Sequence, residues 1–180
     1  MSHFKLISFS CIVAFAAFFT SCGEDPIDSI DKSTNLSSKA PFQIRLTDAP
    51  GDYQQVNIYL LRVSVQKLDS SWIDLPTNAG RYDLLTLQNG LDSMIVNDSL
   101  AVGTKIAGLR LVLGDSNTIM VDSMMHNLKV PSGSSSGFKV KFSDTLEADG
   151  LNILLDFDAD KSVVKNGNET YLLKPVVKVL

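Results

Sequence analysis

The chain has 180 residues, which suggests one domain, and its 16 Lys and Arg against 20 Asp and Glu give a net charge of −4 with histidine neutral. A mildly acidic chain lacks the clustered positive charge that nucleic-acid binding requires, so no nucleic-acid partner is expected, and docking on anionic lipid head groups is disfavoured. The two cysteines are Cys11 and Cys22, so residues 23–180 contain neither a disulfide nor a thiol nucleophile.

Residues 1–21 have the three parts of a secretory signal peptide. Lys5 supplies the positive start, residues 6–19 are almost entirely apolar, and Thr20 and Ser21 are the small residues expected before a cleavage site. As a helix, the apolar run would be about 21 Å long, whereas a bilayer hydrocarbon core is about 30 Å thick. The segment therefore predicts a cleaved signal peptide and not a membrane span.

The residues that lead into Cys22 suggest a lipid anchor. Phe19-Thr20-Ser21-Cys22 resembles the bacterial lipobox, in which the cysteine receives diacylglycerol and the new amino group is acylated. Several acyl chains give stable anchoring, which a single chain does not. An ordinary secretory signal with an incidental cysteine, or a signal anchor, are the alternatives.

The segment after Cys22 bears on location. Gly23-Glu24-Asp25 resembles the export signal of Bacteroidetes lipoproteins, which favours the outer membrane and the cell surface, with the periplasmic face as the alternative. Residues 22–40 are polar and lack apolar periodicity, so they predict a flexible, lipidated tether. A single folded domain is then expected over residues 41–180.

From residue 42 onward, short runs of β-branched and aromatic residues alternate with turn residues such as those of 48–52, which predicts an all-β fold. One helical turn is expected around residues 83–88. About nine to eleven strands at this spacing favour a β-sandwich or a barrel. The expected strands cover residues 42–46, 56–65, 72–75, 81–85, 109–113, 118–121, 138–142, 151–157 and 171–180.

One string resembles the hallmark of a known family. Leu46-Thr47-Asp48-Ala49-Pro50-Gly51-Asp52-Tyr53 is similar to the signature of DUF4382, a domain of unknown function common in lipoproteins of this type. The resemblance spans about residues 41–180 and implies a β-sandwich, immunoglobulin-like or prealbumin-like, but no activity. Further similar segments follow in the same order, at residues 84–90, 109–115, 130–133 with Gly137, 155–158 and 173–175.

The sequence contains no recognisable catalytic centre. His126 is the only histidine after the signal, and no G-x-S-x-G or phosphate-binding glycine motif is present. We therefore expect a protein that is not an enzyme. A carboxylate-based hydrolase that pairs two of Asp48, Asp52 and Asp115 is the remaining, disfavoured alternative.

Alternate aspartates suggest the one candidate metal site. On a strand, Asp156, Asp158 and Asp160 would share one face, and their mutual repulsion could be relieved by calcium, which prefers oxygen ligands. The EF-hand pattern fails, because Lys161 and Gly167 occupy its sixth and twelfth positions. In the simpler interpretation, Asp156 and Asp158 lie on the solvated face of a strand and Asp160 caps the following turn. No other cofactor is expected.

Aromatic residues near turns are the candidate ligand contacts, since rings stack on sugars. Trp72 follows a turn at a strand edge, and Tyr53 lies beside Asp48 and Asp52 in the Pro-Gly turn. Alternatively, Trp72 is a core residue, Tyr53 packs under its own loop, and the aspartates only stabilise the turn. We expect a binding module for a glycan or a surface protein. A structural or adhesive subunit with an open sheet edge is the second hypothesis.

Replacing Cys22 by Ser removes the thiol that would form the thioether to lipid. We expect Cys22→Ser to release the protein from the membrane fraction and to block its labelling with palmitate, measured by fractionation and fatty-acid incorporation. Continued labelling of this variant would contradict the lipid anchor.

Overall fold

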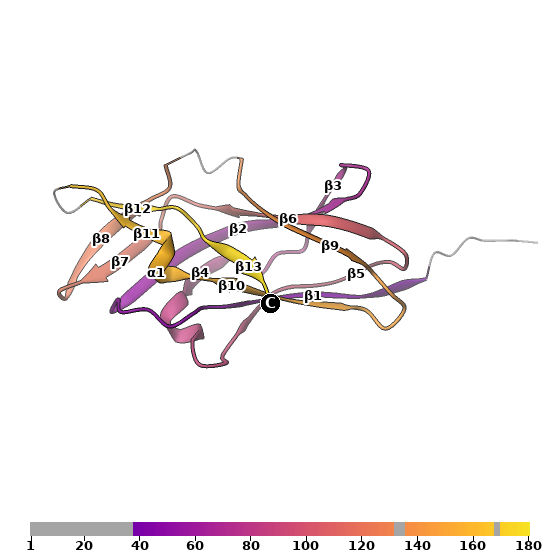
Figure 1. The fold of residues 1–180 in the computed structure, drawn as a ribbon, viewed down its shortest axis with the longest axis horizontal. Coiled ribbons are helices and arrows are strands. Elements are labelled where there is room, and N and C mark those ends of the chain that lie inside the picture. Colours follow the sequence, from indigo (N-terminus) through magenta and orange to yellow (C-terminus); the bar gives the residue numbers. More distant parts are fainter. Residues whose placement is uncertain (1–37, 132–135, 168–169) are drawn as a thin grey trace, which may run out of the picture. The chain divides into compact units, whose positions relative to one another are not determined.

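The computed structural model describes residues 38–131, 136–167 and 170–180, which form two β-sheets (Figure 1). The small sheet has four strands in the order β13-β10-β1-β5, and the large sheet has nine, in the order β11-β12-β8-β7-β2-β6-β9 with β3 and β4 also paired to β2. The strands are β1 (Lys39–Thr47), β2 (Gln55–Lys67), β3 (Trp72–Leu75), β4 (Gly80–Asp83), β5 (Ser93–Ala101), β6 (Lys105–Leu113), β7 (Thr118–Val121), β8 (Met124–Lys129), β9 (Phe138–Thr145), β10 (Leu151–Phe157), β11 (Val163–Lys165), β12 (Tyr171–Leu173) and β13 (Val177–Val179).

The expected all-β sandwich is confirmed. Among the described residues, the helical segments are the 3-10 turn η1 (Leu84–Leu87), within the range where a helical turn was expected, and α1 (Ala159–Ser162). β1 begins at Lys39, and Ala40, next to the expected boundary at Pro41, is buried. The signal peptide, Cys22 and most of the tether lie outside the described residues. No helix in the described part of the chain is long and apolar enough to span a membrane.

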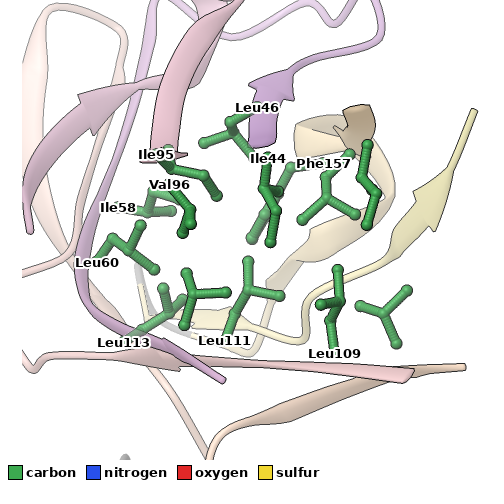
Figure 2. Packing of buried hydrophobic residues seen from close by; sticks show 14 of the residues in the cluster. Ile44, Leu46, Ile58, Leu60, Ile95, Val96, Leu109, Leu111, Leu113 and Phe157 are labelled. Atoms are coloured by element: carbon green, nitrogen blue, oxygen red, sulfur yellow. The ribbon is translucent and has the colours of Figure 1, made fainter. Parts of the chain in front are cut away.

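The core lies between the two sheets, and the alternation of apolar and polar residues in β1 shows how a strand contributes to it. In β1, Phe42, Ile44 and Leu46 are fully buried, while Gln43 and Arg45 between them are only partly so. Each such burial stabilises the fold by roughly 1.5–3 kcal/mol. Figure 2 shows side chains of the small sheet (Ile44, Leu46, Ile95, Val96, Phe157) gathered against those of β2 and β6 (Ile58, Leu60, Leu109, Leu111, Leu113).

The strand β2 organises the large sheet. β3 and β6 both pair with residues 63–66 of β2, so they lie along its opposite edges. β4 and β7 both pair with Asn57, so they too lie on opposite edges. Each edge of β2 is therefore lined by one interrupted run of chain, β3 then β4 on one edge and β6 then β7 on the other.

Where these runs are interrupted, side chains supply hydrogen-bond acceptors that the backbone amides of β2 would otherwise lack. Between β3 and β4, Thr77 Oγ1 accepts a bond from the Val63 amide at 2.8 Å. Between β6 and β7, Asn117 Oδ1 accepts from the Tyr59 amide at 2.7 Å, and its Nδ2 donates to the Gly114 carbonyl at 2.6 Å. A buried amide without a partner costs about 1–3 kcal/mol, so these side chains allow β2 to stay continuous.

Four segments differ from the expected strands. β5, β8 and β11 were not expected, and β8 includes His126. The strand expected over residues 171–180 is divided, because Pro175 lacks an amide hydrogen and cannot pair within a ladder. The chain uses this break to pass from the large sheet, where β12 pairs, to the small sheet, where β13 pairs.

Candidate ligand-binding face

The loop after β1 contains residues 48–53 of the family-like string, and we call it the signature loop. Its contacts with α1 and with the end of η1 form what we call the junction. Asp48 is 5% exposed; its Oδ1 accepts a hydrogen bond from the Ala159 amide at 2.8 Å and its Oδ2 accepts one from Gln88 Nε2 at 3.0 Å. Asp48 thus ties the end of β1 to α1 and to the residue that follows η1. Its carboxylate is buried and accepts two hydrogen bonds that hold the fold together.

The rest of the loop closes on α1. A Cβ at Gly51 would lie 3.4 Å from Asp160 Cβ, and Tyr53 is half-buried and packs against the core. Burial, with the charge of Asp160, raises the pKa of the Tyr53 hydroxyl. Asp52 is exposed. Asp115 lies in a different loop, between β6 and β7, and therefore does not share a loop with Asp48 and Asp52.

The expectation that Asp156, Asp158 and Asp160 share a strand face is wrong, because β10 ends at Phe157 and Asp160 lies in α1. Asp156 Oδ2 lies 3.0 Å from Lys178 Nζ in β13, and Asp158 contacts the Lys161 ammonium. Among the described residues, no group of three or more His, Cys, Asp or Glu side chains is placed to hold a metal ion.

The simpler interpretation of these aspartates is also corrected. Asp156 and Asp158 are 5% and 8% exposed, so they do not lie on a solvated face. The residue that caps α1 is Asp158, whose Oδ1 accepts from the Lys161 amide at 3.0 Å, and not Asp160. Phe157 between them is fully buried. The turn is thus held by the residue at the helix N-cap, where an aspartate bonds an otherwise unpaired amide.

The buried carboxylates affect one another. The pKa of Asp48 is raised from 3.8 to about 6. Burial is the largest cause, the charges of Asp156 and Asp158 act in the same direction, and the hydrogen bonds from Gln88 and Ala159 act in the opposite direction. Asp48 therefore gains or loses its proton near pH 6.

The large sheet has a second, polar face, which we call the outer face. The side chains of Val56, Ile58 and Leu60 enter the core, and after a register shift those of Val63 and Val65 do so. The intervening β2 side chains point outward with their cross-strand partners. Cations of the outer face include Arg62, Arg81, Arg110, Lys139 and Lys141, and the carboxylates of Asp74 and Asp83 lie there as well.

Trp72 belongs to this face and is half-buried. The guanidinium carbon of Arg110 lies 3.8 Å from the centroid of the indole ring, and Lys139 Nζ lies 5.8 Å from it. Trp72 is therefore not a core residue, yet one side of its ring is covered by Arg110. Sequence reasoning identified Trp72 but missed both cations, since they come from β6 and β9 and only the pairing of the strands brings them together.

At the other end of the outer face there is a hollow of about 670 Å³. Thr118 and Asn127 face each other across β7 and β8, in register with Asn57 of β2, and Arg81 of β4 is opposite Tyr59. We refer to this cavity as the hollow; it is lined by Arg81, Asp115, Ser116, Thr118, Asn127, Leu128, Lys129, Val130 and Pro131. Asp115 is the one lining residue that had been singled out from the sequence.

Comparison with known proteins identifies a family and no activity. Residues 39–175 match the family model described as "Domain of unknown function (DUF4382)". No curated protein and no solved structure gives a significant match to the chain. The matched region begins with the first residue of β1 and includes the signature loop, α1, Trp72 and the hollow, so the junction and the outer face both lie within the family's domain.

The raised pKa of Asp48 makes stability depend on pH. The folded state holds a proton that the unfolded state releases between about pH 4 and pH 6, so this group's contribution to the free energy of unfolding falls as pH rises, by at most about 3 kcal/mol. Asp48→Asn keeps an oxygen for the Ala159 amide and removes the titration. Its stability relative to the wild type should therefore increase from about pH 4 to pH 7, measured by urea unfolding.

Asp52→Asn is the matched control, because it removes an exposed carboxylate from the same loop. A stability difference between Asp48→Asn and the wild type that stays constant over this range would contradict the assignment.

Proposed function

The chain belongs to the DUF4382 family, and from its outer face we propose that it is a non-catalytic, lipid-anchored binding module that holds a glycan at the cell envelope. Cys22 carries the anchor, and the tether behind it leads to the sandwich. The module is attached to the outer membrane and lies on its cell-surface side.

The observation that carries this proposal is the polar lining of the hollow. Asp115 accepts hydrogen bonds, Arg81 and Lys129 donate them, and Asn127 does both, which matches the mixed donors and acceptors of sugar hydroxyls. A concave site with a few convergent polar groups is the usual form of a ligand pocket. Arg81, Thr118 and Asn127 lie on sheet strands, which hold a site more rigidly than loops do.

The structural or adhesive alternative has less support. It needs a strand edge that can take another chain, and β9 ends the order of the large sheet. β9 carries Lys139 and Lys141, and lysines on an edge strand oppose pairing with a further strand. The polar hollow, in contrast, has no role in strand addition.

A glycan array tests the proposal. We expect the full chain, purified in detergent, to bind a subset of glycans, and Asp115→Asn and Asn127→Ala to weaken that binding by about tenfold, the loss typical of a hydrogen bond to a charged group. Asp122→Asn is the matched control. Asp122 is an exposed aspartate at the β7–β8 turn with φ of 50°, a conformation that asparagine adopts readily.

The proposal is wrong if no glycan is retained above the detergent blank. It is also wrong if Asp115→Asn and Asp122→Asn bind alike, because the hollow then takes no part in binding.

A further inference from the structure

Trp72, Arg110 and Lys139 converge on the outer face from β3, β6 and β9. In the strand register, Asp74, Ser64, Arg110 and Lys139 form one cross-strand row. Trp72 begins the neighbouring row, where Gly108 has no side chain to separate the indole from Arg110. The guanidinium therefore lies on the indole, at 3.8 Å from the ring centroid.

The charge of Arg110 is not compensated by a carboxylate among the described residues. Its Nε is buried without a hydrogen-bond partner. The carboxylate of its own row, Asp74, is instead bonded by Ser64 Oγ at 2.6 Å and lies 3.6 Å from Arg62. Elsewhere in the described chain, Arg45 is paired with Asp92 at 3.2 Å. Arg110 is thus held by an aromatic ring and not by a counter-ion, and Lys139 and Lys141 beside it add uncompensated positive charge.

This inference rests on the proposed function and names its ligand class. We propose that Trp72, Arg110 and Lys139 form an anion subsite and that the glycan is an acidic polysaccharide with carboxylate groups. A guanidinium donates two parallel hydrogen bonds to a planar carboxylate, and the Lys139 ammonium adds a third donor. Because Trp72 already holds the guanidinium in place, little conformational freedom of Arg110 is lost on binding.

The distance between the subsite and the hollow favours an extended ligand. Trp72 is opposite Gln66 and Arg81 is opposite Tyr59, so the two regions are separated by seven residues of β2, roughly 23 Å at about 3.3 Å per residue. One polysaccharide chain that lies along β2 reaches both. A single lipid head group does not.

Trp72 provides a direct readout, because it is the only tryptophan of the chain. We titrate the full chain with polygalacturonate and follow the indole fluorescence, and we repeat the titration with fully methyl-esterified polygalacturonate, dextran sulfate, and vesicles that contain an anionic lipid. The free acid should change the emission and saturate, the methyl ester should bind at least about tenfold more weakly, and added salt should weaken binding of the free acid.

A pair of lysine variants isolates the subsite. Lys139→Gln removes an ammonium 5.8 Å from the Trp72 ring, and Lys165→Gln removes one 5.9 Å from the Tyr171 ring, in the hairpin of β11 and β12. We expect Lys139→Gln to weaken polygalacturonate binding by about fivefold to tenfold and Lys165→Gln to leave it unchanged. Arg110→Gln should weaken it further, and melting curves show whether each variant is folded.

The outcomes separate this inference from the function on which it rests. Equal binding of acid and ester, or equal affinities of the two lysine variants, overturns the anion subsite and leaves glycan binding intact. Binding of dextran sulfate without polygalacturonate overturns the assignment to carboxylates. A response to anionic vesicles alone overturns the polysaccharide, and no response to any glycan, here or on the array, overturns both proposals.

Discussion

The continuous pairing of β2 is the constraint on which the remaining structure depends. On each of its edges, β2 (Gln55–Lys67) is hydrogen-bonded to two strands with a gap between them. The side chains of Thr77 and Asn117 supply the missing acceptors in these gaps. Because β2 alternates, this pairing fixes the core on one face and the polar groups on the other. A slip by one residue would carry Ile58 outward and Tyr59 inward, and both the core and the outer face would be lost.

The family-like string that begins at Leu46 makes contacts that hold the same sandwich together. Asp48 joins the end of β1 to the start of α1, and Asp158 and Asp156 bind lysines close by. Thr47 Oγ1 donates to the Leu87 carbonyl at 2.8 Å and adds a further link to η1. These contacts close one end of the sandwich. The string of residues 46–53 thus joins elements of the sandwich, while Arg110 and Asp115 of the outer face lie within another family-like segment, residues 109–115.

Much of the fold could be predicted from the sequence, but little of the site. Alternation in residues 42–46 and 138–142 identified β1 and β9 correctly. β8 escaped because its residues, Met-Met-His-Asn-Leu-Lys, give no clear period, and Leu128 is the one buried side chain among them. Net charge concealed the basic outer face, since Arg62, Arg110 and Lys139 are far apart in the chain and only strand register collects them. Asp48 was expected at a turn, but its partner Ala159 is 111 residues away.

The central claim is that the outer face of the large sheet binds the ligand. Its most direct test is chemical-shift mapping of the isotope-labelled protein with short galacturonate oligomers. The account predicts the largest shifts at the Trp72 indole, at Arg110 and Lys139, and at Asp115 and Asn127 in the hollow. Shifts confined to the signature loop or to β1, β5 and β10 would contradict it.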